Sequence, residues 1–188
     1  MYKYPVYQPS LAGNEKKYVL ECLESTWISS KGRFIGEFEK DFAAFIGVPH
    51  AAAVCNGTVA LHVALLALGV GPGDEVIVPS LTYVASVNAI RYTGAEPVFV
   101  DVRPDTWQVD PAEVEKRIGP KTRAIMAVHL YWHPCEMDKL AELASRNHLF
   151  LVDDCAEAFG SRYKGVHVGG IGHVSTFSFF GNKTITTG

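Results

Sequence analysis

The chain has 188 residues, of which 48 % are hydrophobic and 20 % are charged. These values are typical of a soluble globular protein and exclude intrinsic disorder and collagen-like repeats. The 17 Lys and Arg and 20 Asp and Glu side chains give a net charge of −3, with no cluster of either sign. We therefore expect neither a nucleic-acid surface nor a polybasic membrane anchor. No apolar run approaches the roughly 20 residues that a membrane-spanning helix needs.

The cysteines and the first residues point to a cytoplasmic location. The first ten residues lack the apolar core of a secretory signal. Cys22, Cys55, Cys135 and Cys155 form no CxxC pair and lie in apolar or strand-like segments. This pattern favours buried, reduced thiols over disulfides or metal ligands.

Hydrophobic periodicity predicts helices that alternate with short strands. The helices are predicted over residues 14–26, 35–46, 58–68, 84–92, 111–118 and 137–146. The strands are predicted over residues 51–55, 76–78, 98–100, 124–130, 150–152 and 176–180. Asp110, Pro111 and Glu113 have the spacing of a capping box with proline at the first helical position.

Several of the strand segments are apolar throughout rather than alternating, which is typical of strands covered on both faces. The alternation therefore predicts an α/β fold with a mostly parallel sheet and helices on both faces. Because there is no internal linker or repeat, we expect one domain.

Ligands of open α/β sheets bind beyond the carboxyl ends of the strands. At the first such end, Asn56, Gly57 and Thr58 precede a helix. A glycine turn that opens a helix exposes backbone N–H groups and can bind an anion, and Thr58 could donate a hydroxyl and cap the helix. The alternative is a plain capped helix. A nucleoside triphosphate or a dinucleotide is not expected, since the segment has neither a Walker lysine nor GxGxxG.

At the second strand end, Asp153, Asp154 and Glu157 follow a buried apolar run. Carboxylates there are costly unless they are paired. Such a group can hold a proton on a cofactor ring nitrogen, bind a metal, or cap the next loop.

At the third strand end, Lys183 follows an aromatic run and the turn residue Gly181. Apolar surroundings disfavour the ammonium form, and a neutral amine is what an imine-forming nucleophile requires. The alternative is a lysine that extends from the strand end into solvent.

Together, an anion cradle, a carboxylate and a buried lysine are the groups that pyridoxal 5′-phosphate (PLP) requires. Tyr83, after another strand, could stack on the cofactor ring or could belong to the core. His129 and His133 are four residues apart, but Pro134 and the preceding strand argue against a helix that would align them, so we expect no metal site.

Four motifs carry a family resemblance: NGTVAL at 56–61, PSLTYVASVNA at 79–89, DCAEAFG at 154–160 and FSFFGNK at 177–183. Together with STWISSKG at 25–32 and VHLY at 128–131, they resemble the DegT/DnrJ/StrS sugar aminotransferases over essentially the whole chain. The resemblance implies the large domain of the PLP-dependent aspartate aminotransferase-like fold, called fold type I.

The resemblance also implies roles for the residues at these strand ends. Lys183 would form the imine with PLP and then act as the acid and base that moves the substrate proton. Asp154 would pair with the pyridine nitrogen, and Tyr83 would stack on the ring. Glu157 would lie near the ring hydroxyl, where many relatives have glutamine.

Further roles concern the phosphate and the substrate. Gly57, Thr58 and Ser178 would hold the cofactor phosphate. Trp27 and Ser29 lie in a stretch that matches the family's N-terminal substrate loop.

Within this family, the chain most resembles a branch that acts on a GDP-linked keto sugar, and this resemblance implies a reaction. An amino group would pass from L-glutamate to the C4 keto group of GDP-4-keto-6-deoxy-D-mannose, giving GDP-perosamine for O-antigen or another surface polysaccharide. The active site of the whole protein would lie at the interface of a homodimer.

Two departures from the family pattern stand out. Trp132 follows His-Leu-Tyr where relatives have a small residue, usually glycine. The sequence also ends inside a glycine-rich motif, and family members are much longer. We therefore expect residues 1–188 to be the N-terminal part of the large domain, without the C-terminal small domain. Alone, this polypeptide is expected to be weakly folded and to have little activity.

Three alternatives remain open at this stage. A PLP-dependent sugar dehydratase would carry histidine in place of the imine-forming lysine, so Lys183 argues against it. An aminotransferase acting on a UDP- or dTDP-linked keto sugar would have much the same motifs. The third alternative is a non-catalytic PLP-fold fragment.

Overall fold

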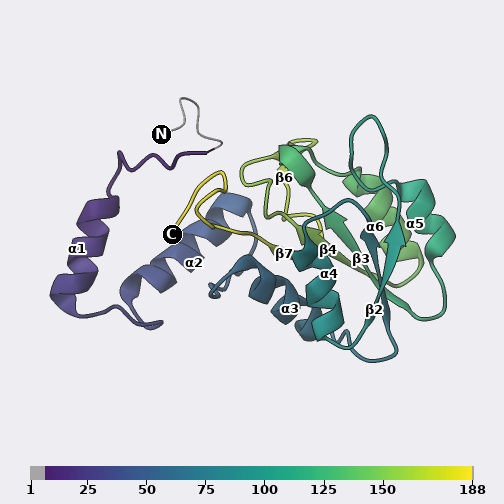
Figure 1. Cartoon of the computed structure of the whole chain (residues 1–188), viewed down its shortest axis with the longest axis horizontal. Coiled ribbons are helices and arrows are strands. Elements are labelled where there is room, and N and C mark those ends of the chain that lie inside the picture. Colours follow the sequence, from purple (N-terminus) through teal and green to yellow (C-terminus); the bar gives the residue numbers. More distant parts are fainter. Residues whose placement is uncertain (1–6, 188) are drawn as a thin grey trace.

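The computed structural model describes residues 7–187, which form an α/β fold around a five-stranded sheet (Figure 1). Every strand pair in this sheet is parallel, and the strand order is β2-β1-β3-β4-β7. Its strands are β1 (Glu75–Pro79), β2 (Glu96–Val100), β3 (Thr122–Val128), β4 (Phe150–Asp154) and β7 (Val174–Thr176). A small antiparallel hairpin consists of β5 (Arg162–Tyr163) and β6 (Val166–His167).

Six α-helices are described, and all six lie where the periodicity predicts them. They are α1 (Glu15–Ser25), α2 (Arg33–Ile46), α3 (Gly57–Ala67), α4 (Val84–Tyr92), α5 (Pro111–Arg117) and α6 (Met137–Arg146). A short 3₁₀ turn, η1 (Leu130–Trp132), follows β3.

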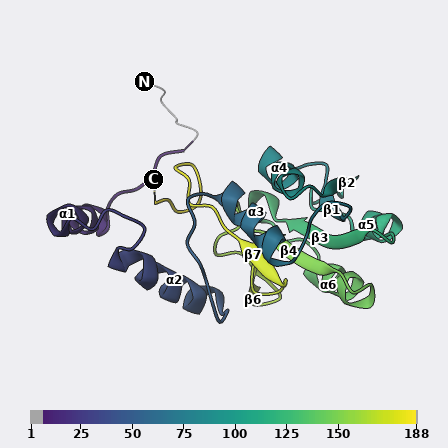
Figure 2. The same cartoon turned by 90° about the horizontal axis from the view of Figure 1, so that it is seen from below.

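Helices cover both faces of the sheet, as predicted. Figure 2 shows α3 and α4 on one side of the sheet and α6 on the other. Leu65 of α3 and Ile90 of α4 pack into one buried cluster with β-strand residues such as Met126. Leu140 of α6 and Ile125 belong to the cluster on the opposite face. Both faces of the sheet are therefore shielded from solvent, which explains its continuous apolar strands.

The N-terminal helices extend away from the sheet (Figure 1). Helix α2 attaches through its phenylalanine face, because the ring centroids of Phe42 and Phe177 lie 4.9 Å apart and those of Phe45 and Phe159 lie 5.1 Å apart. Helix α1 buries none of its residues.

Two strand predictions are wrong. Residues 51–55 form no strand, and the N–H of Ala53 is bonded to the Glu39 side chain of α2 instead of to a neighbouring strand. Alanine also has a low preference for strands. The last strand, predicted over 176–180, covers only Val174–Thr176. Phe177 and Phe179 lie beyond it and pack on α2, which gave this segment its strand-like apolar pattern.

Helix caps also correct two details. Asp110 caps α5 by accepting the N–H of Ala112, whereas Glu113 pairs with Lys116 and does not close a capping box. Asn56, not Thr58, caps α3, since its side-chain oxygen accepts the N–H of Val59 at 2.9 Å.

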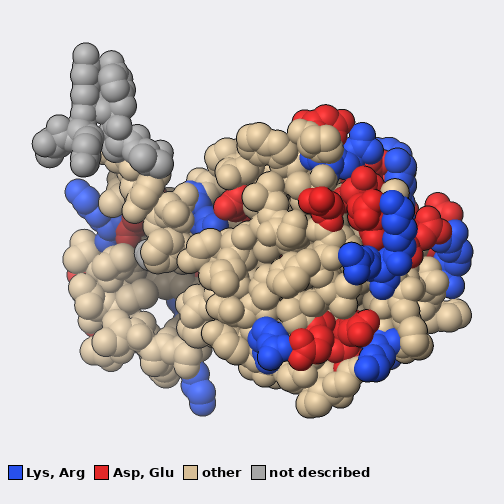
Figure 3. All heavy atoms as spheres, turned by 45° about the vertical axis from the view of Figure 1, so that its right-hand side comes forward, with Lys and Arg blue, Asp and Glu red and all other residues tan. Residues whose placement is uncertain are grey.

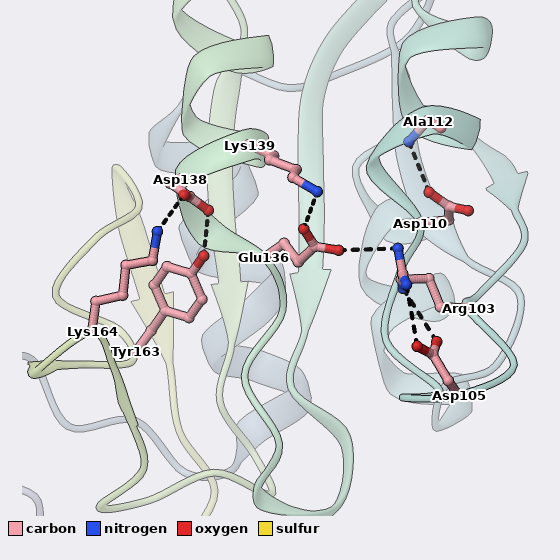
Figure 4. A network of polar contacts seen from close by, with 9 residues as sticks. All are labelled: Arg103, Asp105, Asp110, Ala112, Glu136, Asp138, Lys139, Tyr163 and Lys164. Carbon is pink, nitrogen blue, oxygen red and sulfur yellow. Dashed lines mark hydrogen bonds and ion pairs between the residues drawn. The ribbon is translucent and has the colours of Figure 1, made fainter.

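Charged side chains of both signs interleave on the outer surface of the α/β layer (Figure 3). Figure 4 shows a set of these contacts, which we call the surface network. Its charged and phenolic members are Arg103, Asp105, Glu136, Asp138, Lys139, Tyr163 and Lys164. Within residues 7–187, no helix combines the length and apolar character needed to cross a membrane.

Candidate active site

A cavity of about 300 Å³ opens at the carboxyl ends of β1, β3, β4 and β7. The N-terminal turn of α3 forms one wall, and the segment after β7 forms another. Seven residues singled out from the sequence line this cavity: Gly57, Thr58, Tyr83, Asp154, Glu157, Ser178 and Lys183. Their segments lie up to 126 positions apart, from Gly57 to Lys183, and the parallel sheet brings them to one edge.

Asp154 is the last residue of β4 and is buried. Its Oδ2 accepts the Ser86 hydroxyl of α4 at 2.7 Å, and its Oδ1 accepts the N–H of Ala156 at 3.2 Å. Burial raises the pKa of Asp154, which these two donors and the charge of Lys183 partly offset. The site thus holds a carboxyl group that a cationic ligand group would stabilise in its charged form.

Lys183 lies after the aromatic segment, and its side chain is only 19 % exposed. Its surroundings are less apolar than the sequence suggests, because its Nζ lies 3.8 Å from Oε1 of Glu157. The other carboxylate oxygen of Glu157 accepts the N–H of Tyr131 at 3.2 Å. Glu157 therefore contacts both the lysine and the turn after β3.

Gly57 and Ser178 form a close contact at the start of α3. A Cβ atom on residue 57 would lie 3.1 Å from the Cβ of Ser178 and 3.4 Å from its hydroxyl. The free N–H groups of a helix N-terminus favour an anion, and the hydroxyls of Thr58 and Ser178 line the same cavity. This corner has the donors and the space that a phosphate group requires.

Tyr83 precedes α4, and 72 % of its surface is exposed. This exposure excludes the alternative that Tyr83 packs in the core. Tyr83 lies at the cavity wall, where a flat ligand could stack on its ring.

Trp27 and Ser29 do not line this cavity. Trp27 borders a separate cavity of about 370 Å³ beside α1 and α2, together with Lys31 and Arg33. The hydroxyl of Ser29 accepts the N–H of Lys31 within the connecting loop. Substrate binding by Trp27 and Ser29 stays a prediction.

Sequence reasoning missed several polar residues of the site. Ser86 and Thr82 form a chain of hydroxyls that ends on Asp154, with 2.8 Å between their oxygens. Thr176 and His129 also line the cavity, and within the described part of the chain Thr176 Oγ1 and His129 Nε2 are buried without a hydrogen-bond partner. Thr82, Ser86 and His129 lie within motifs that carry the family resemblance, but no local pattern marks Thr82 and Ser86 as polar partners of Asp154.

His129 was considered only as a metal ligand, but the structure gives it another environment. Its Nδ1 accepts the N–H of Cys135 at 3.1 Å, so the hydrogen of the neutral ring lies on Nε2. Burial lowers the pKa of His129 to about 4. Among residues 7–187, no group of three or more His, Cys, Asp and Glu side chains is placed to hold a metal ion.

The donor set of the cavity fits PLP. The Gly57 corner offers N–H and hydroxyl donors for a phosphate, and Asp154 offers a carboxylate for a protonated ring nitrogen. Lys183 supplies an amine in the same cavity. The unpartnered Thr176 Oγ1 is a further polar atom at this wall.

Comparisons with known proteins agree with this geometry. The chain is 65 % identical over 184 residues to the GDP-perosamine synthase of Escherichia coli O157:H7, covering 98 % of this chain and 50 % of that protein. It is 59 % identical to the GDP-perosamine synthase of Caulobacter vibrioides, covering 96 % of this chain and 48 % of the relative. The chain therefore spans about half the length of these relatives.

Solved structures show the same fold. The Streptococcus pneumoniae protein Spr1654, named as a sugar aminotransferase, is 34 % identical and was solved in PLP and PMP forms, with TM-scores of 0.94 and 0.95. Each comparison covers 99 % of this chain and about half of that protein, 51 % and 50 %. Residues 9–188 match the model of the DegT/DnrJ/EryC1/StrS aminotransferase family. This chain belongs to the DegT/DnrJ/EryC1/StrS aminotransferase family, whose members use PLP.

Proposed function

We propose that the protein transfers an amino group from L-glutamate to the C4 keto group of GDP-4-keto-6-deoxy-D-mannose, giving GDP-perosamine for a surface polysaccharide. The observation that carries the aminotransferase chemistry is the single cavity that contains Gly57, Asp154 and Lys183. The choice of sugar rests on the three relatives named GDP-perosamine synthase, which are 65 %, 59 % and 54 % identical to this chain.

When bound, PLP supplies an aldehyde that condenses with amines and a ring that withdraws electrons from the reacting carbon. In the proposed role, Lys183 would supply the amine that holds this aldehyde and would move the substrate proton from one carbon to another. Glu157, 3.8 Å from the amine, keeps Lys183 directed into the cavity between these events.

Asp154 holds a proton on the ring nitrogen in this proposal. The carboxylate is positioned for that task by Ser86 and by the N–H of Ala156, which fix both of its oxygens. The charge of the protonated ring would in turn stabilise the buried carboxylate. Gly57, Thr58 and Ser178, which line the cavity, would bind the phosphate, and Tyr83 at its wall would cover one face of the ring.

The test uses the complete protein that carries this sequence. With PLP it should show the visible absorbance of an imine, and Lys183→Ala should abolish that absorbance and lower the turnover by about 10³-fold or more. Persistence of the absorbance in Lys183→Ala would show that Lys183 is not the nucleophile.

The nucleotide sugar is tested separately. With L-glutamate, GDP-4-keto-6-deoxy-D-mannose should yield an amino sugar and 2-oxoglutarate. Turnover of a UDP- or dTDP-linked keto sugar, with none of the GDP-linked sugar, would reject the proposed substrate and keep the aminotransferase chemistry. Loss of the C3 hydroxyl without amination would instead indicate a dehydratase.

We also propose that the protein acts in the cytoplasm as a homodimer. The four cysteines are free thiols, as is usual in a reducing compartment. Tyr83 and Phe180 line the cavity yet are 72 % and 64 % exposed, which is consistent with a second subunit covering this wall. Sedimentation of the complete protein at twice its monomer mass is the expected result.

A further inference from the structure

Trp132 bonds to the residue that follows the candidate nucleophile. Its indole Nε1–H donates to the hydroxyl of Thr184 at 2.6 Å, across 52 positions of sequence. The indole is a donor only, so Thr184 is the acceptor in this bond. The contact joins the turn after β3 to the loop that carries Lys183.

The main chain of Trp132 is fixed by the segment after β4. Its N–H donates to the carbonyl of Glu157 at 3.2 Å, and its carbonyl accepts the Ser161 hydroxyl at 2.9 Å. The N–H of Tyr131 donates to the Glu157 side chain. Both Tyr131 and Trp132 have positive φ, 51° and 61°, which residues with side chains seldom adopt. These bonds therefore hold the turn in a conformation that it would not favour by itself.

The loop that carries Lys183 has mostly local bonds. The N–H of Lys183 donates to the carbonyl of Phe180, and the N–H of Thr187 donates to the carbonyl of Phe179. Polar side-chain contacts also reach from this loop to the segments after β3 and β4, beside the ring contact of Phe179 with Phe159. They include the ion pair of Lys183 with Glu157 and the hydrogen bond of Thr184 with Trp132. The ion pair is made by the amine itself, whereas the hydrogen bond leaves the amine free.

The ion pair and the hydrogen bond therefore differ in whether they can hold the loop during the reaction. An amine that takes part in the reaction must leave Glu157, and the ion pair then no longer restrains the loop. The bond between Trp132 and Thr184 remains, since neither group touches the reacting atoms in the proposed function. A glycine in place of Trp132 would adopt the positive φ more readily but would have no donor.

We propose that Trp132 is a positioning residue, which holds the Lys183 loop against the cavity through Thr184. This inference rests on the proposed function, because it assigns Trp132 a role in placing the nucleophile of that reaction. It predicts that removal of the bond slows reactions of the Lys183 amine and weakens PLP binding without changing the fold.

Four variants of the complete protein test this inference. Trp132→Phe removes the donor and keeps an aromatic ring, and Thr184→Val removes the acceptor at nearly constant volume. Thr184→Ser keeps the hydroxyl and is the matched control. The double variant Trp132→Phe/Thr184→Val completes a double-mutant cycle. The measurements are the PLP dissociation constant, the rate of the absorbance change after addition of L-glutamate, and the Tm.

Trp132→Phe and Thr184→Val should each weaken PLP binding and slow the absorbance change by about threefold to tenfold, the effect of one lost hydrogen bond. The double variant should show no greater loss than either single variant, and Thr184→Ser should match the parent. The KM for L-glutamate should stay constant, because the bond does not touch the amino donor.

Three outcomes would overturn the inference. They are unchanged PLP binding and rates in Thr184→Val, additive losses in the double variant, or a loss in Thr184→Ser as large as in Thr184→Val. If the first outcome is accompanied by a lower Tm, the contact is purely structural. A parent protein without Lys183-dependent absorbance would instead reject the proposed function.

Discussion

The pKa of a carboxyl group is shifted in opposite directions in the surface network and in the cavity. In the network, Asp138 lies between Lys164 and Tyr163 on an exposed surface, and these partners hold its pKa below the usual range (Figure 4). In the cavity, Asp154 is buried, and burial raises its pKa. The carboxylate of the surface network is thus paired with a lysine of the same protein. Burial of Asp154 in the cavity is unfavourable for its charged form, which a cationic ligand would stabilise.

In these two regions, charged residues indicate a functional site only where they are buried. Exposed ion pairs contribute little to stability, so their number says little about either folding or activity. A buried carboxyl group with neutral donors is expensive for folding. Because Asp154 also lines the cavity, its burial points to a ligand that binds there, whereas buried Asp153 lies outside the cavity. Substitutions in both regions test this contrast.

Asp154→Asn should lower turnover by about 10²- to 10³-fold, because a neutral amide cannot hold a cationic ring nitrogen. PLP binding should persist, since the phosphate corner is unaltered. The assay is 2-oxoglutarate production together with the cofactor absorbance. Turnover within a factor of ten of the parent would contradict the assigned role of Asp154.

Gly57→Ala should weaken PLP binding by about tenfold, because the new Cβ atom would meet Ser178 at 3.1 Å and displace a phosphate donor. Gly36→Ala is the matched control. It lies in α2 with no atom within 4 Å of the new Cβ, and should stabilise the protein by about 0.5–1 kcal/mol without affecting PLP. Titration with PLP and thermal melting separate the two effects. Equal PLP affinities in both variants would remove the phosphate assignment.

Asp153→Asn should change how stability depends on pH. Burial raises the pKa of Asp153 to about 7, so the folded state keeps its proton between about pH 4 and 7 while the unfolded state loses it. Stability therefore falls as the pH rises through this window, by roughly 1 kcal/mol for each unit. The variant does not titrate, so its Tm relative to the parent should be higher at pH 8 than at pH 5. The same Tm difference at both pH values would refute the shifted pKa.

Asp138→Asn should have the smallest effect. A carboxyl group with a lowered pKa contributes stability above its ordinary pKa and loses it as the pH falls, but solvent screens this exposed group. We expect a Tm change below about 2 °C near neutral pH, a still smaller change at 1 M salt, and unchanged turnover. A loss of turnover like that of Asp154→Asn would abolish the contrast between the two regions.

Local sequence patterns predict the positions of the helices. The strand ends predict that Gly57, Asp154 and Lys183 lie in one site. Apolar spacing predicts α4 and α6 at their observed bounds. The strand ends were recognised because burial on both faces leaves a continuous apolar run. Residues 51–55 have a similar apolar run but form no strand. The N–H of Ala53 donates to the Glu39 side chain of α2, and no local pattern reveals this distant partner.

The rest of the site depends on contacts between distant segments. Ser86 reaches Asp154 across 68 positions, and Trp132 reaches Thr184 across 52. Such partners follow from the strand order, which periodicity does not specify. Asn56 was passed over as the cap of α3 because Thr58 offered an equally suitable side chain two residues later.

The two adjacent acids at the end of β4 also constrain how this strand can vary. Successive side chains of a strand point to opposite faces, so Asp154 meets Ser86 on one side and Asp153 meets the N–H of Gly172 on the other. A slip of one residue would turn each acid to the opposite face, away from its own donors. Insertions and deletions in evolution should therefore be rare within β4, and more readily accepted in the short hairpin of β5 and β6.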